Sequence, residues 1–237
     1  MNSEDLALVH SLPFFSNLTE AQAADLLSRS YMQRFPRGTL LFDEGQRADF
    51  LMVLLEGAVE LFARNHDRHE AVVEILFPVD SFILAAALTG APYLMSARTL
   101  QPSRILMLDA RMLRRAVAID PGLAAIVMAE LAGHFRRMVR QVKDLKLRTG
   151  AQRLGCYVLG LAGEDGEITL SLDKRTLASR LGMTAENLSR AFSTLRDHGL
   201  VVQGSRLLVS DREMLTAFSH PDPLIDVDEG ALSIEIE

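Results

Sequence analysis

The feature that most constrains the fold of this chain is a strict repeat of apolar residues between positions 128 and 145. Successive members lie 3, 4, 3, 4 and 3 residues apart, and arginines and lysines flank them. A period of about 3.5 residues is typical of paired helices, whereas a helix packed on its own globule repeats about every 3.6 residues. We therefore predict a long dimerisation helix beginning near Pro121, with a helix packed inside its own monomer as the alternative. The predicted dimer seam comprises Met128, Leu131, Phe135, Met138, Val142 and Leu145.

The segment Lys174–Leu195 indicates two short helices joined by a tight turn. Gly182 lies where the chain must reverse, and glycine adopts positive φ at little cost. Thr184 is suited to cap the second helix, because its hydroxyl can accept a backbone N–H. This is the pattern of a helix-turn-helix, whose second helix reaches base edges in the major groove. The alternative is an ordinary corner of two helices with solvated charges.

The polar face of the second helix carries side chains suited to reading bases. An arginine such as Arg190 can bind guanine with two hydrogen bonds, and a glutamate such as Glu186 can accept one from cytosine. The predicted DNA-binding residues are Lys174, Arg175, Thr184, Ala185, Glu186, Asn187, Ser189 and Arg190.

The rest of the sequence indicates an α+β protein with several domains. Short apolar runs between Arg34 and Met107 are interrupted by glycine and proline, which is typical of an antiparallel β module. Thr149 and Gln152 form a capping-box pattern that begins a helix, and Val201–Val209 indicates a β-hairpin wing. We expect a sensing domain at 1–120 with N-terminal helices, a dimerisation helix and hinge at 121–148, a winged helix-turn-helix at 149–218 and a tail at 219–237.

The net charge of −6 is unusual for a DNA-binding protein, but its distribution accounts for it. The tail beyond Ser219 holds six acids and no lysine or arginine, so residues 1–218 are neutral overall. We predict that this acidic tail is disordered. The single cysteine, Cys156, and the lack of a signal-peptide pattern or a long apolar run predict a cytoplasmic protein.

The order of parts and four motifs resemble the Crp/Fnr superfamily of bacterial transcription regulators. The motifs are P-R-G-T-L-L-F-D-E-G at 36–45, L-L-E-G-A-V-E-L-F at 54–62, A-Q-R-L at 151–154 and T-A-E-N-L-S-R at 184–190. The resemblance covers roughly residues 12–212. It implies a β-roll like a cyclic-nucleotide-binding jelly roll, a homodimer on a palindromic DNA site and RNA polymerase as a partner.

The recognition motif is similar to that of the fumarate–nitrate reduction branch of the family. That branch uses E-x-x-S-R, which corresponds here to Glu186, Ser189 and Arg190, whereas the cyclic-AMP receptor branch has glycine at the serine position. The resemblance therefore implies a half-site like T-T-G-A-T, not T-G-T-G-A.

Two sensing chemistries of the family do not match this chain. An iron–sulfur cluster needs several cysteines, and the chain has only Cys156. Cyclic-AMP binding in the family uses a glycine-glutamate pair and an arginine, where this chain has Leu84, Ala85 and Met95. A buried phosphate without such partners is costly. Arg98 would replace the arginine only if the register slipped, so a cyclic nucleotide is the less favoured alternative effector.

The segment P-Y-L-M-S-A-R-T-L resembles nitric-oxide-responsive regulators of denitrification, some of which are thought to bind haem. This implies haem as a cofactor and nitric oxide as the effector, with a different apolar ligand, or none, as the alternative. Candidate axial ligands are His10, His66, His69, His134 and Met95, with His134 alternatively a hydrogen-bonded structural residue. The predicted effector pocket comprises Phe82, Leu84, Ala85, Met95, Ser96 and His134.

The rival class of protein is a ligand-storage or interaction module that does not bind DNA. The sequence contains no G-x-S-x-G, phosphate-binding loop or H-E-x-x-H motif, and its cysteine has no evident histidine partner. We therefore predict that the chain is not an enzyme.

Overall fold

The computed structural model describes residues 9, 15, 18–68, 70–170 and 172–226. The chain divides into two compact units, Met1–Phe135 and Arg136–Glu229, so the division falls inside one long helix.

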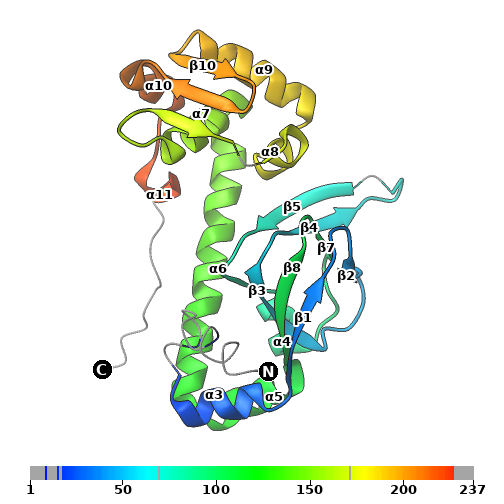
Figure 1. Ribbon diagram of the computed structural model, residues 1–237. Helices are drawn as coiled ribbons and strands as arrows, with labels where there is room; N and C mark the ends of the chain where they lie inside the picture. Colours follow the sequence, from blue (N-terminus) through cyan, green and yellow to red (C-terminus); the bar gives the residue numbers. More distant parts are fainter. Residues whose placement is uncertain (1–8, 10–14, 16–17, 69, 171, 227–237) are drawn as a thin grey trace. The chain divides into compact units, whose positions relative to one another are not determined.

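The first unit is built on two four-stranded antiparallel sheets (Figure 1). One sheet has the spatial order β1 (Ser30–Phe35), β8 (Ser103–Asp109), β3 (Phe50–Glu56) and β6 (Asp80–Phe82). The other has the order β2 (Leu40–Phe42), β7 (Ser96–Thr99), β4 (Val59–Arg64) and β5 (Glu70–Leu76). Non-consecutive neighbours show that strands cross between the sheets, as in a roll. The predicted antiparallel β-roll is therefore confirmed.

In the described part of this unit, three short helices accompany the roll: α3 (Glu20–Leu27), α4 (Leu84–Thr89) and α5 (Ala110–Ile119). Thr19 and Gln22 form a reciprocal capping box at the start of α3. Asp109 caps α5 by accepting the backbone N–H groups of Arg111 and Met112. Leu84, Leu106 and Leu113 belong to one apolar core, which joins α4 and α5 to β8.

The long helix α6 (Pro121–Leu147) begins at the predicted proline. The carboxylate of Asp120 accepts the backbone N–H of Leu123 at 3.0 Å. Leu123 and Val127 then enter the apolar core of the first unit. One end of α6 is therefore fixed to the roll by burial of apolar side chains.

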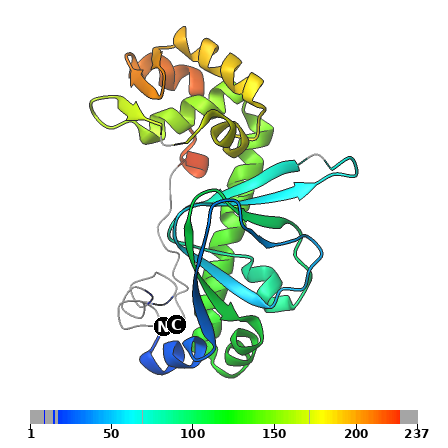
Figure 2. The same ribbon diagram turned by 45° about the vertical axis from the view of Figure 1, so that its right-hand side comes forward.

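The second unit is a small helical domain with a three-stranded sheet. It contains α7 (Gly150–Leu161), β9 (Glu167–Thr169), α8 (Lys174–Arg180), α9 (Ala185–Arg196), β10 (Leu200–Gln203), β11 (Arg206–Val209), α10 (Arg212–Ser219) and α11 (Pro223–Asp226). The sheet order is β10-β11-β9, and α7 packs against α9 and α10 (Figure 2). The predicted capping box is present at Thr149 and Gln152. The predicted wing is the β10–β11 hairpin, so a winged helix-turn-helix is confirmed.

The tail differs from the predicted disorder over its described part. Residues 220–226 are placed, and α11 ends in Asp226. The Asp226 carboxylate accepts two hydrogen bonds from the guanidinium of Arg148, at 2.7 and 2.6 Å. Disorder was predicted because the tail contains acids but no lysine or arginine. That prediction did not include the buried Arg148, which binds Asp226. Residues 227–237 lie outside the described residues.

Among the described residues, no helix combines the length and apolar character needed to cross a membrane.

Candidate nucleic-acid interface

The two helices of the predicted reading motif are capped as the sequence indicates. The Asp173 carboxylate accepts the N–H of Thr176 at 2.8 Å, and the Thr184 hydroxyl accepts that of Asn187 at 3.2 Å. Between them, Gly182 has φ of +61°, and a Cβ there would collide with the side chain of Leu145. The positive φ of this turn favours glycine, and a Cβ there would in addition displace the end of the Leu145 side chain.

The guanidinium of Arg153 holds this turn on α7. Its Nε donates to Leu181 O at 2.8 Å, and its Nη2 donates to Gly182 O at 3.3 Å. Its Nη1 donates to Arg148 O at 2.8 Å, at the end of the long helix. Arg153 is the arginine of the A-Q-R-L motif. The sequence interpretation noted that motif without assigning Arg153 this role.

The α9 helix buries one face and leaves the other free for a ligand. Leu188, Ala191, Phe192 and Leu195 lie in the core of the second unit. All eight residues predicted to bind DNA are exposed. The structure therefore brings those eight residues to the surface of α8, the turn and the first turns of α9.

Three reading side chains, those of Glu186, Ser189 and Arg190, make hydrogen bonds within α9 itself. Arg190 Nη2 lies 2.6 Å from Glu186 Oε1, and both side chains are about three-quarters exposed, at 73% and 74%. Ser189 Oγ donates to Ala185 O at 3.0 Å. Exposed ion pairs are worth less than about 1 kcal/mol, so both groups can exchange these partners for base edges at little cost.

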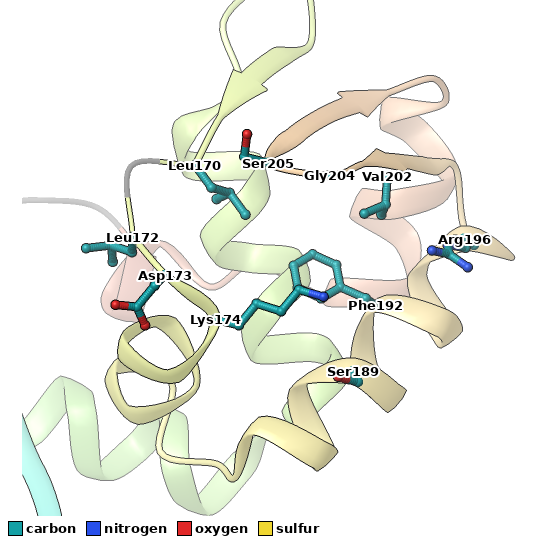
Figure 3. Close-up of a pocket in the computed structure, with 10 residues that line it drawn as sticks. All are labelled: Leu170, Leu172, Asp173, Lys174, Ser189, Phe192, Arg196, Val202, Gly204 and Ser205. Atoms are coloured by element: carbon teal, nitrogen blue, oxygen red, sulfur yellow. The ribbon is translucent and has the colours of Figure 1, made fainter.

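A pocket of about 330 Å³ lies between the reading helix and the wing (Figure 3). Ser189, Phe192 and Arg196 line it from α9, and Lys174 lines it from the start of α8. Lys174 and Arg196 give its lining two positive charges. The remaining lining residues are Leu170, Leu172, Asp173, Val202, Gly204 and Ser205.

The residues predicted to form an effector pocket belong to two different apolar cores or lie outside both. Leu84 lies in the core that contains α5, whereas Phe82 belongs to the second core of the roll, with Met95 packed against it. Ala85 is exposed. The hydroxyl of Ser96 is buried and accepts the backbone N–H of Glu44 at 3.0 Å.

Arg98 is the arginine that would bind a cyclic-nucleotide phosphate if the register slipped. In the structure it forms ion pairs with two carboxylates. Its guanidinium donates to Glu60 and, at 3.1 Å, to Glu70. It also lies over the Phe62 ring, 4.6 Å from the ring centroid. These contacts neutralise the positive charge that a phosphate would need.

The candidate haem ligands lie in different environments. His66 is exposed in the turn between β4 and β5, and Met95 is half-buried. His10 and His69 lie outside the described residues. His134, on α6, has its Nε2 3.2 Å from Ser81 Oγ and 3.3 Å from Glu130 Oε1. The sequence interpretation did not include Asp80 and Glu130, although the spacing E-x-x-x-H signals a shared helix face.

Most of the predicted dimer seam is exposed in the single chain. Met128, Phe135, Met138 and Val142 are between 50% and 65% exposed. Two members have contacts within the chain: Leu131 packs against the core of the first unit, and Leu145 lies against Gly182. Four large apolar side chains on one helix therefore need a covering surface.

Comparison with known proteins gives two family matches. The cyclic nucleotide-binding domain model matches residues 32–120, and the Crp-like helix-turn-helix domain model matches residues 152–218.

Individual proteins match over most of the chain. A proposed cAMP-binding regulatory protein from Silicibacter pomeroyi DSS-3 is similar in structure, with 32% identity, coverage of 91% of this chain and 98% of that one, and a TM-score of 0.60. The CRP-like cAMP-activated global transcriptional regulator of Mycobacterium tuberculosis is 26% identical over 85% of this chain and 93% of its own length. The nitrogen fixation regulation protein FixK of Azorhizobium caulinodans is 27% identical over 76% of each.

Proposed function

The chain belongs to the Crp/Fnr family of DNA-binding transcription regulators, and on this premise we propose that it acts in the cytoplasm as a homodimer on a palindromic DNA site. The single observation that carries the proposal is the exposed reading face of α9. Its side chains Glu186, Ser189 and Arg190 stand on the surface, while the opposite face of the helix is buried.

We propose that this face recognises a half-site like T-T-G-A-T. The support is the E-x-x-S-R pattern together with the partners of its side chains. Arg190 can give up Glu186 and bind guanine with two hydrogen bonds, which leaves the Glu186 carboxylate to accept from cytosine. Lys174, Arg175 and Arg196 supply nearby positive charge for phosphates. From the family resemblance we also propose that the DNA-bound dimer has RNA polymerase as a partner.

The test is the affinity of an Arg190→Ala variant for a T-T-G-A-T palindrome, measured by fluorescence anisotropy at fixed salt. We expect a loss of about 1–3 kcal/mol, with weaker discrimination at the contacted base pair. Arg29→Ala is the matched control, because it removes an exposed arginine from the first unit. Equal affinities for the wild-type protein and Arg190→Ala would contradict the assignment of the reading face.

For the effector, we propose nitric oxide sensed through haem in the first unit. Its support is the resemblance around Pro92–Leu100 and the apolar side chains of Phe82 and Met95. His134 stays a candidate axial ligand, and its Nε2 would exchange its contacts with Ser81 Oγ and Glu130 Oε1 for the iron. Absorption spectra of protein purified with haem available, before and after nitric oxide, test this proposal. A Soret band at one haem per subunit is expected.

Absence of a Soret band would favour the alternatives, which are a different apolar effector or none. A cyclic nucleotide is the less favoured ligand, because Arg98 is already paired with Glu60 and Glu70. Calorimetric titration with cyclic AMP separates the alternatives, and we expect no binding heat.

A further inference from the structure

Three side chains of metal-binding type meet beside α6 in the first unit. Asp80 lies at the start of β6, and Glu130 and His134 lie on α6. One carboxylate oxygen from each acid and one imidazole nitrogen lie within 4.8 Å of one another. We propose that these three side chains bind one divalent transition-metal ion.

The two helix residues already have the separation that one ion requires. Residues four apart in a helix lie one above the other on the same face. Glu130 Oε1 and His134 Nε2 are 3.3 Å apart. Two ligand atoms that are each about 2.1 Å from a tetrahedral ion lie about 3.4 Å from each other. The third donor, a carboxylate oxygen of Asp80, lies within 4.8 Å of both of these ligand atoms.

Ser81 orients one of these ligands. Its side chain is buried, and its Oγ donates to Glu130 Oε1 at 2.6 Å. Outer hydrogen bonds of this kind fix the orientation of a ligating carboxylate. Ser81 is therefore a positioning residue, because it acts through Glu130.

The donor set and its burial indicate the class of ion. Two carboxylates and one imidazole suit Zn²⁺, Fe²⁺ or Mn²⁺, whereas Ca²⁺ takes about six to eight oxygen ligands. The side chains of Glu130 and His134 are 27% and 20% exposed. An ion can therefore enter from solvent and keep a water as its fourth ligand, while its charge is only partly screened.

A bound ion would join two elements of the first unit. β6 leads directly into α4, and α6 carries the exposed seam residues. An ion held by both would restrain α6 against the roll, and would thereby favour one state of the helix that we propose as the dimer contact. Metal binding itself depends on neither DNA nor the dimer, so it can be tested separately.

The experiment titrates Zn²⁺ into chelator-treated, full-length protein by isothermal calorimetry, and records the visible absorption of the Co²⁺ form. We expect one ion per chain and a tetrahedral Co²⁺ spectrum. Asp80→Asn, Glu130→Gln and His134→Gln should each weaken Zn²⁺ binding at least tenfold. Ser81→Ala should weaken binding by a smaller factor and alter the Co²⁺ spectrum.

His66→Gln is the matched control, because it removes an exposed histidine from a turn of the same unit. It should bind Zn²⁺ as the wild-type protein does. Circular dichroism of each variant establishes that the fold is kept. Absence of Zn²⁺ binding by the wild-type protein, or equal binding by a folded His134→Gln variant, would overturn the proposal.

Discussion

At the scale of single residues, Gly182 sets the backbone conformation of the turn between α8 and α9. Its positive φ disfavours any side chain, and a Cβ there would also meet Leu145. We predict that Gly182→Ala lowers the free energy of unfolding of the second unit by about 1–3 kcal/mol, measured by urea denaturation. Gly204→Ala is the control, because Gly204 has φ of +65° and nothing within 4 Å. If both variants lost the same stability, contact with Leu145 would contribute nothing.

Cys156 is a residue whose reactivity follows from its surroundings. Burial, followed by the nearby Asp226 carboxylate, raises the pKa of its thiol to about 11, and Sγ donates to Ser219 O at 3.3 Å. Iodoacetamide at pH 8 should therefore label the native protein far more slowly than the urea-unfolded protein, as followed by mass spectrometry. Equal rates would show that the thiol is accessible.

The same shift affects stability at high pH. The thiolate is disfavoured in the folded state, so the contribution of Cys156 is fully present below its ordinary pKa near 9 and is lost as pH rises through about 11. Cys156→Ser should show a smaller decline in unfolding free energy between these pH values than the wild-type protein. Parallel declines would contradict this cause.

At the scale of elements, α11 is held by a buried charge pair. The side chain of Arg148 is 6% exposed and bonds Asp226 through two hydrogen bonds and Asp144 at 3.0 Å. These partners raise the pKa of the Arg148 guanidinium. We predict that Asp226→Asn lowers the unfolding free energy of the second unit by about 1–3 kcal/mol in thermal denaturation. Glu213→Gln, an exposed acid of α10, should leave it unchanged.

The sequence predicts those elements that depend on local patterns. The helix caps at Thr149 and Thr184, the wing and the buried face of α9 are set by residues a few positions apart, and all are present. The order of the strands in the two sheets could not be derived from such patterns, because it depends on contacts between distant segments.

Long-range side-chain contacts were missed for the same reason. Arg148 and Asp226 are 78 residues apart, and Ser81 and His134 are 53 apart. Charge counting placed the acids of the tail in solvent, and family resemblance placed Phe82 and Leu84 in one pocket. Neither charge counting nor family resemblance identifies which distant residue the fold brings into contact with a given side chain.

At the scale of the whole molecule, the exposed residues of α6 predict the assembly. Met138→Glu places a charge among apolar side chains, so we expect the wild-type protein to sediment as a dimer and the variant as a monomer at the same concentration. Leu94→Glu is the control, because Leu94 is 83% exposed and lies off the seam. A dimeric Met138→Glu variant would show that the chains pair through another surface.

The Arg148–Asp226 pair also bears on how the chain matures on the ribosome. Arg148 is synthesised well before its carboxylate partner, which follows 78 residues later. A nascent chain that ends between the two already contains Asp144, but lacks Asp226, which accepts two hydrogen bonds from the buried guanidinium. Synthesis of α11 therefore supplies the second carboxylate that the Arg148 guanidinium binds in the folded protein.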